Sequence, residues 1–190
     1  MKTSAVPVNT AADNYLTLLE RVLLGEIYPD YSRLARHYWW QRVIATILKR
    51  KGLELVKKTK PSDRRDGLDW PTLALTMIGQ KRMQNLRSCV EDIIRNDIPG
   101  DLIETGVWKG GACVYMKGIL KAHGNENKTV WVADSFEGLP PSTGDVDKKL
   151  APNYDKSNDV IGVSLEEVQE NFRRFGLLDE RVRFLKGWFK

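Results

Sequence analysis

The sequence has few of the residues that build disulfide scaffolds and soft metal centres. Its 190 residues include only two cysteines, Cys89 and Cys113, and two histidines, His37 and His123. Small secreted domains that rely on disulfides need more cysteines than this, so we expect two reduced, buried thiols in a cytoplasmic protein. A Cys/His metal site lacks ligands for the same reason. The sequence therefore offers no residue that we assign as a metal ligand.

Long apolar runs are also absent. No stretch is long enough to cross a bilayer, and the N-terminus lacks the charged-then-apolar order of a secretory leader. Apolar residues still make up 42% of the chain, which is enough for a hydrophobic core. The length suits one domain with an appendage.

Positive charge is unevenly placed along the chain. The net charge is only +5, yet lysines and arginines crowd residues 49–65. Such a segment is compatible with nucleic-acid binding. A solvated basic helix face is the more common cause, so we expect no nucleic-acid partner.

Helical periodicity dominates the first half of the chain. After Asp13, apolar residues recur at helical spacing until Gly25 breaks the pattern. Residues 31–58 read as helix in one or two pieces, residues 60–71 as a polar linker, and residues 73–95 as a second helix. The sequence thus predicts a helical N-terminal region over residues 1–98.

The second half alternates between strand and helix patterns. Strands are predicted over 102–107, 129–134 and 182–185, with helices over 111–122 and from the capping box at Ser164 onward. This order predicts right-handed crossovers and a parallel α/β sheet. Parallel sheets rarely stop at three strands, so we expect residues 99–190 to be the first half of such a domain.

A glycine-rich turn joins the first predicted strand to its helix. Its glycines are Gly106, Gly110 and Gly111, with Trp108 where a dinucleotide site needs glycine. No Gly-Lys-Ser/Thr follows, which excludes a P-loop. A cofactor without phosphates remains, and S-adenosylmethionine fits, with Glu104 near its ammonium and Asp134 near its ribose. The alternative is that these acids only cap helices or line a loop.

At these residues the chain resembles the macrocin O-methyltransferase family, which methylates deoxysugars on macrolides and related natural products. The matching segments are Thr76–Gly79, Pro99–Cys113, Thr129–Pro140, Asn171–Asp179 and Val182–Phe189. The resemblance implies a class I methyltransferase (Rossmann-like) fold and S-adenosylmethionine as donor. It also implies an O-methyl transfer assisted by Mg²⁺, a sugar or other natural-product hydroxyl as acceptor, and a homodimer.

Residues expected to bind the cofactor lie beside the three predicted strands or in the helical region. The set is Met77, Glu104, Thr105, Gly106, Gly110, Gly111, Asp134, Ser135, Gly187 and Trp188. The last two are placed near the adenine, although Trp188 and Met77 have core packing as their alternative. Tyr28, in a predicted turn, and the polar loop over 138–159 are candidate lids.

Two departures from the family affect the interpretation. The family's Mg²⁺-binding aspartates and its acid or base lie on strands beyond this sequence, so we assign no catalytic residue, and a non-catalytic module that binds cofactor or a partner is the alternative. Residues 39–60 read as an insertion carrying a basic amphipathic helix. We expect that helix to pack on its own domain or across a dimer, with an anionic membrane surface as the less favoured alternative.

Overall fold

The structure is a computed structural model of the 190-residue chain, and it describes residues 10–28, 31–33, 39–53, 56–140 and 161–188. Most of the candidate lid over residues 138–159 lies outside these described residues. The aspartates of that loop, at positions 145, 147, 155 and 159, also lie outside the described residues.

The second half of the chain forms the predicted parallel sheet. Its strands are β3 (Leu102–Thr105), β4 (Val130–Asp134) and β5 (Val182–Lys186), in the order β3-β4-β5. The register pairs Leu102 with Val130 and Val130 with Val182, so the carboxyl ends of all three strands lie at one edge. The predicted strands and their parallel direction are therefore confirmed.

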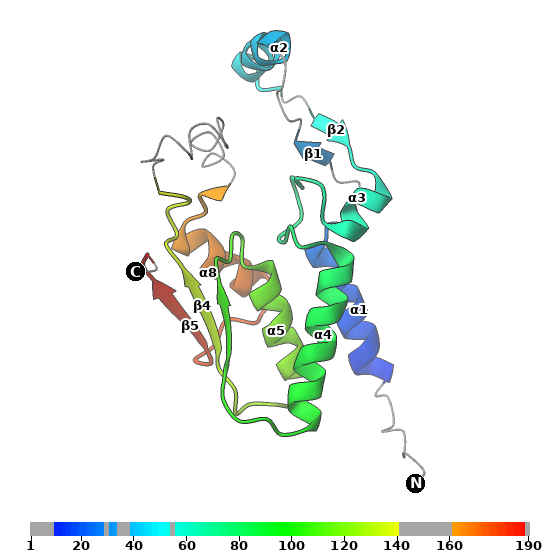
Figure 1. The fold of residues 1–190 in the computed structure, drawn as a ribbon, viewed down its shortest axis with the longest axis vertical. Helices are drawn as coiled ribbons and strands as arrows, with labels where there is room; N and C mark the ends of the chain where they lie inside the picture. Colours follow the sequence, from blue (N-terminus) through cyan, green and yellow to red (C-terminus); the bar gives the residue numbers. More distant parts are fainter. Residues whose placement is uncertain (1–9, 29–30, 34–38, 54–55, 141–160, 189–190) are drawn as a thin grey trace, which may run out of the picture.

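Helix α5 (Gly111–Ala122) occupies the centre of the molecule. Ten consecutive residues from Gly111 to Leu120 are buried. One side of α5 packs on β3 and β4, and the other side packs on α1 (Thr10–Leu23) and α4 (Gly79–Arg95), as the layers in Figure 1 show. A helix covered on both sides must be apolar nearly all round, which explains its run of apolar and small residues.

Close approach between α1 and α5 depends on Gly118. A Cβ atom at this position would lie 2.3 Å from Leu19 Cδ2.

Helix α8 (Leu165–Arg174) packs against α5 as well, and its first turn is capped as predicted, with the Ser164 hydroxyl accepting the Glu167 N–H at 3.2 Å.

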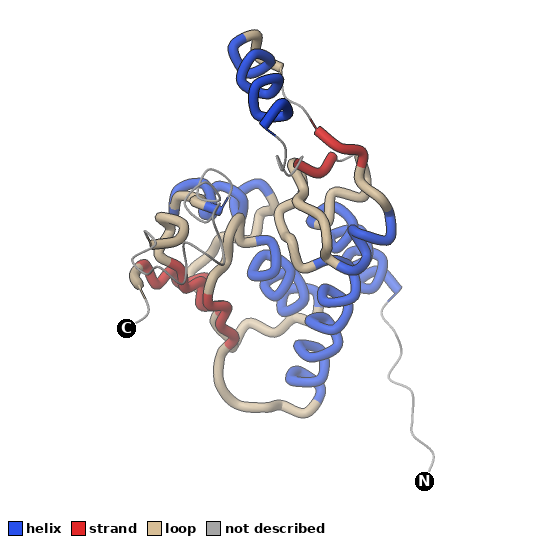
Figure 2. Tube along the Cα trace, turned by 45° about the horizontal axis from the view of Figure 1, so that its top comes forward, coloured by secondary structure: helices blue, strands red, loops and turns tan. Residues whose placement is uncertain are grey.

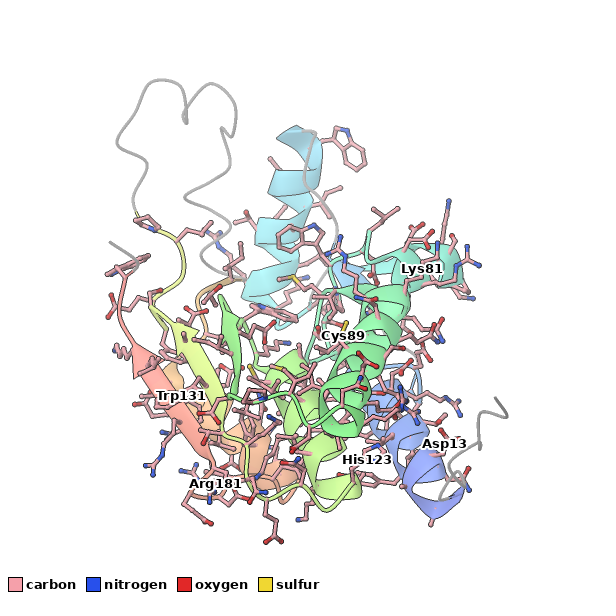
Figure 3. All side chains as sticks on the ribbon, turned by 60° about the horizontal axis from the view of Figure 1, so that its bottom comes forward. Asp13, Lys81, Cys89, His123, Trp131 and Arg181 are labelled. Carbon is pink, nitrogen blue, oxygen red and sulfur yellow. The ribbon has the colours of Figure 1, made fainter. Side chains whose placement is uncertain are left out.

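A polar network fixes the N-terminal helices to α5. The Tyr115 hydroxyl donates to Glu20 Oε2 at 2.9 Å, and both side chains are buried. Arg87 on α4 donates to Asp13 at 2.6 Å and to Glu91 at 2.7 Å, and Figure 3 shows Asp13 at the end of the helical layer where His123 also lies. These bonds orient the helical layer on the α/β part.

The predicted helix over residues 31–58 is wrong at both ends. Strands β1 (Tyr31–Arg33) and β2 (Val56–Lys58) form a short antiparallel pair, and only α2 (Trp39–Arg50) between them is helical. The paired residues of β1 and β2 lie far apart in the sequence; Ser32 and Lys57, for example, are 25 positions apart. Helical periodicity describes neighbouring residues only, so it does not predict this pairing.

Two more boundaries differ from the prediction. The polar linker contains the helix α3 (Pro61–Asp66), where proline occupies the first helical turn and Gly67 ends it in the left-handed region at φ 69°. The second long helix, α4, begins at Gly79 rather than at residue 73. The segment between them passes beside the glycine turn described below.

The apolar side of α2 faces solvent. Trp40, Val43, Ile44 and Ile47 are all more than two-fifths exposed. Figures 1 and 2 show α2 set apart from the layered body, beyond the β1–β2 pair. Within the described residues, this stripe does not pack on the chain's own domain, so that half of the expectation is wrong, and packing across a dimer stays a prediction.

The cysteines differ in burial. Cys113 is fully buried, but Cys89 is exposed on α4, which corrects the prediction that both thiols are buried. In the described part of the chain, no helix combines the length and the apolar content needed to cross a membrane.

Candidate functional site

The glycine turn and the end of β4 are joined by hydrogen bonds. Gly106 N–H donates to the Ala133 carbonyl at 2.8 Å, which extends the β3–β4 ladder into the turn. Asp134 then accepts the Val107 N–H on Oδ2 at 2.7 Å and the Phe136 N–H on Oδ1 at 2.9 Å. Asp134 therefore fixes both loops at the carboxyl edge of the sheet, and its carboxylate stays partly exposed there.

Glu104, at the end of β3, is held by the first turn of α5. The Cys113 thiol donates to Glu104 Oε2 at 2.9 Å, and this bond and the Cys113 backbone both act to lower the pKa of the Glu104 carboxyl. Burial is the main cause of a raised Glu104 pKa, and the negative Asp134 raises it further. In the described part of the chain, neither Glu104 nor Asp134 forms an ion pair with a lysine, arginine or histidine.

The three glycines of the turn have different surroundings. Gly106 adopts φ 86°, and a Cβ atom on it would meet nothing within 4 Å. A Cβ atom on Gly110 would lie 2.7 Å from Val168 Cγ1, and one on Gly111 would lie 2.4 Å from the Leu75 carbonyl oxygen. Gly110 and Gly111 thus permit protein packing, and their predicted contact with a cofactor stays a prediction. Gly106 borders open space.

The segment before α4 lies against the N-terminus of α5. Gly111 N–H donates to the Leu75 carbonyl at 3.0 Å, and Lys109 Nζ donates to the Thr72 carbonyl at 3.0 Å. The same ammonium stands 4.6 Å from the centroid of the Trp108 ring. Trp108 is buried with φ 50°, so it belongs to the packed side of the turn rather than to the ligand side.

The remaining predicted residues occupy several environments. Thr105 is exposed at the end of β3, and Ser135 is buried with its hydroxyl donating to the Gly138 carbonyl at 3.0 Å. Met77 lies in a bend before α4 and packs partly buried against the main core, so its predicted placement on a helix is wrong. Its contact with a cofactor and that of Ser135 stay predictions.

The chain after β5 is held close to β4. Gly187 N–H donates to the Asp134 carbonyl at 2.9 Å, which brings this residue to the same edge as Glu104 and Asp134. Trp188 is 45% exposed, which does not match the alternative that it is a core residue. Tyr28 is 73% exposed in the predicted turn. The structure thus gathers the strand-end residues at one edge.

Sequence reasoning missed the part that Cys113 plays. The sequence predicts only a reduced, buried thiol at this position, whereas the structure makes it the donor to Glu104. The sequence does contain a signal for this contact. Cys113 is the third residue of a helix that follows a strand and a tight turn, and side chains in a first helical turn lean toward the helix N-terminus, which here adjoins the end of the strand.

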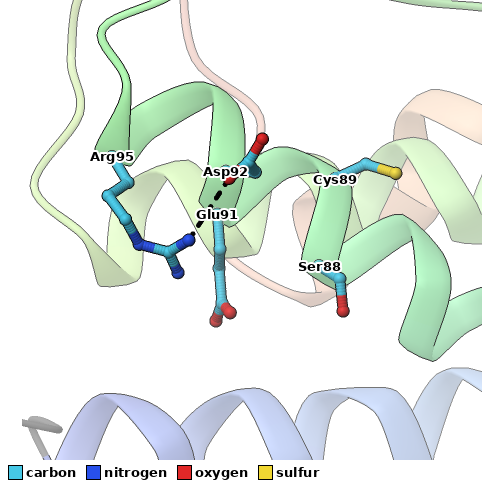
Figure 4. A pocket seen from close by; sticks show the side chains of 5 residues that line it. All are labelled: Ser88, Cys89, Glu91, Asp92 and Arg95. Carbon is cyan, nitrogen blue, oxygen red and sulfur yellow. Dashed lines mark hydrogen bonds and ion pairs between the residues drawn. The ribbon is translucent and has the colours of Figure 1, made fainter. Parts of the chain in front are cut away.

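A concave region away from the strand-end edge lies on the outer surface of α4. Its lining residues are Ser88, Cys89, Glu91, Asp92 and Arg95, and Figure 4 shows the Arg95–Asp92 ion pair, 3.3 Å long, beside them. All five come from one helix, and none contacts the strand-end edge. Within the described ranges, no group of three or more His, Cys, Asp and Glu side chains is placed to hold a metal ion.

The fold and the site define a Rossmann-like, class I methyltransferase architecture, preceded by a helical region. The solved structure of the O-methyltransferase NovP superposes with a TM-score of 0.76 at 45% sequence identity, covering 93% of this chain and 64% of that one. The sequence description of the macrocin-O-methyltransferase (TylF) family matches residues 12–190, and the chain belongs to that family. The resemblance inferred from the sequence is confirmed.

Two characterised relatives give the same result. The demethyldecarbamoylnovobiocin O-methyltransferase of Streptomyces niveus is 46% identical, with 98% of this chain and 66% of the relative covered. The mycinamicin III 3''-O-methyltransferase of Micromonospora griseorubida is 43% identical, with 96% of this chain and 66% of the relative covered. The chain therefore spans just under two thirds of the length of these relatives.

Proposed function

We propose that this chain binds S-adenosylmethionine at the carboxyl edge of β3 and β4 and serves an O-methyltransferase reaction. The acceptor would be a hydroxyl of a sugar or another natural-product scaffold. The family membership and the names of the relatives support the reaction class. S-adenosylmethionine, when bound, supplies the methyl group from its sulfonium.

The pair Glu104 and Asp134 carries the proposal. Two carboxyl groups at the ends of adjacent strands, without a protein cation in the described residues, favour a positively charged ligand. The methionyl ammonium meets that requirement at Glu104. Asp134 retains acceptor capacity for ribose hydroxyls, because each carboxylate oxygen accepts more than one hydrogen bond.

The chain's own residues contribute binding and alignment. Gly106 leaves open space beside the turn, and Gly187 is held at the same edge by its bond to the Asp134 carbonyl. An SN2 methyl transfer gains mainly from fixing the hydroxyl, methyl and sulfur in line and from excluding water. Tyr28 stays a candidate lid for that second role.

The predicted Mg²⁺ and homodimer rest on the family resemblance. Because the described residues include no cluster that fits a metal ion, we derive no step through Mg²⁺ and assign no catalytic base. We also propose that the chain divides into a helical region over 1–98 and an α/β part over 99–190, and that residues 39–60 are an insertion relative to the family.

The test compares two matched aspartates. Asp134 and Asp101 lie at opposite ends of the β3–β4 pair, and each accepts hydrogen bonds from two N–H groups, those of Asp101 being Thr129 N–H and Trp131 Nε1–H. We expect Asp134→Ala to weaken binding of S-adenosylhomocysteine about fivefold or more, and Asp101→Ala to change it less than about twofold. Isothermal titration calorimetry measures both.

Equal binding by the parent and Asp134→Ala would show that the cofactor site is misplaced. Methyl transfer to a deoxysugar hydroxyl distinguishes an enzyme from a non-catalytic module. Turnover that stops when a chelator removes the metal supports the Mg²⁺-assisted reaction, and cofactor binding without turnover supports the module.

A further inference from the structure

Cys113 is a buried polar group to which the proposed function gives no part. Its side chain has no exposed surface, and its sulfur lies 2.9 Å from Glu104 Oε2. Cys113 is the third residue of α5, and Glu104 is the third residue of β3, so a strand end and a helix start meet through these two side chains. This contact crosses the glycine turn, where a small shift of either element would move the carboxylate.

We propose that Cys113 is a positioning residue that fixes the Glu104 carboxylate for the ammonium of the cofactor's amino-acid part. The inference rests on the proposed function. It adds a specific device: a thiol from the first turn of α5 donates to one oxygen of the carboxylate near the end of β3, across the glycine turn, and the backbone of the same residue also favours the ionised carboxylate.

The chemistry of a thiol suits this task. A thiol is a weak donor with the size and burial preference of a small apolar group, so it fits the packed first turn of α5. Burial and the negative charges of Glu104 and Asp134 raise the Cys113 thiol pKa, which keeps the proton on sulfur. The thiol therefore remains a donor at neutral pH. A lysine or arginine in its place would neutralise Glu104 and compete with the ligand.

The main experiment uses two ligands that differ at the relevant group. S-adenosylhomocysteine carries the ammonium, whereas 5′-methylthioadenosine has the same nucleoside and a thioether but no amino-acid part. We expect Cys113→Ala to weaken S-adenosylhomocysteine binding about three- to tenfold, because a hydrogen bond to a charged group is lost. Binding of 5′-methylthioadenosine should change less than about twofold.

Two variants serve as matched controls. Cys113→Ser restores a donor at the same place, so we expect binding within about threefold of the parent. Cys89→Ala removes the exposed cysteine of α4 and should change neither ligand's binding.

A titration without ligand tests the contact itself. The Cys113 hydrogen bond lowers the Glu104 pKa against the upward effect of burial. Carbon-detected NMR of the side-chain carboxyl groups should therefore show a higher Glu104 pKa in Cys113→Ala. Cys113→Ser should lie closer to the parent, and Cys89→Ala should match it. A packing role alone would leave the Glu104 pKa in place.

The outcomes separate the two proposals. Loss of affinity confined to S-adenosylhomocysteine, together with the shifted Glu104 pKa, supports the positioning role. Equal loss for both ligands, or no loss, overturns it while the proposed function stands. If the parent chain binds neither ligand, the proposed function fails and the inference fails with it.

Discussion

Gly111 joins the glycine turn to the helical N-terminal region, and an added methyl group there tests that junction. In Gly111→Ala the new Cβ atom would lie 2.4 Å from the Leu75 carbonyl oxygen, 2.6 Å from the Leu75 carbonyl carbon and 3.0 Å from Thr76 Cβ. Two of these atoms are backbone, so a side-chain rotation cannot relieve the overlap. The Gly111 N–H also donates to the same Leu75 oxygen at 3.0 Å, so any shift lengthens that bond.

The cost follows from these contacts. Forcing a methyl group into a packed site costs about 1–3 kcal/mol, and alanine's better helix propensity offsets less than about 1 kcal/mol at this first helical position. We expect a net loss of about 1–2 kcal/mol in the free energy of unfolding. For a chain of this size that corresponds to a fall of roughly 2–8 °C in Tm.

Urea denaturation followed by circular dichroism measures this loss, with Gly187→Ala as control. A Cβ atom on Gly187 meets nothing within 4 Å, and its φ is not in the left-handed region. We expect that control to stay within about 0.5 kcal/mol of the parent. A Gly111→Ala chain as stable as the control would refute the placement of residues 72–78 over the turn.

Three further predictions concern other parts of the molecule. Glu104→Gln should stabilise the ligand-free chain at neutral pH, because folding raises the pKa of Glu104. The stability that Glu104 contributes is fully present below its unfolded-state pKa and is lost as the pH rises through its folded-state pKa, whereas glutamine does not titrate. The advantage of Glu104→Gln measured by denaturation should therefore grow as the pH rises above about 4, the ordinary pKa of a glutamate, and an advantage independent of pH would contradict it. Tyr115→Phe removes the buried bond to Glu20 and should cost about 1–3 kcal/mol by the same assay, whereas a loss below about 0.3 kcal/mol would count against that bond. Ile47→Glu on the exposed side of α2 should change the free energy of unfolding by less than about 0.5 kcal/mol, and a larger loss would show that the stripe is packed in solution.

Local sequence patterns determined the α/β half of the fold. The helix from Gly111 to Ala122, the cap at Ser164 and the parallel direction of the three strands follow from periodicity, stop signals and the alternation of strand and helix. These signals reside in neighbouring residues, so the sequence alone carries them. The strand-end positions of Glu104 and Asp134 follow from the same patterns, since parallel strands end at one edge.

Contacts between distant segments needed the tertiary structure. The β1–β2 pair, the Leu75 carbonyl against Gly111 and the Arg87 bonds that fix α1 join residues far apart in sequence. Their hydrogen bonds depend on three-dimensional approach, which periodicity does not encode.

The candidate site shows the same division. Its acids and its open glycine, Gly106, were identified from the sequence, because their chemistry and their spacing are local. The environment of Glu104 was decided by packing: burial on the sheet, the nearby charge of Asp134 and the Cys113 thiol together set its pKa and orientation. A sequence names the charged groups, and the fold determines which partners and how much water surround them.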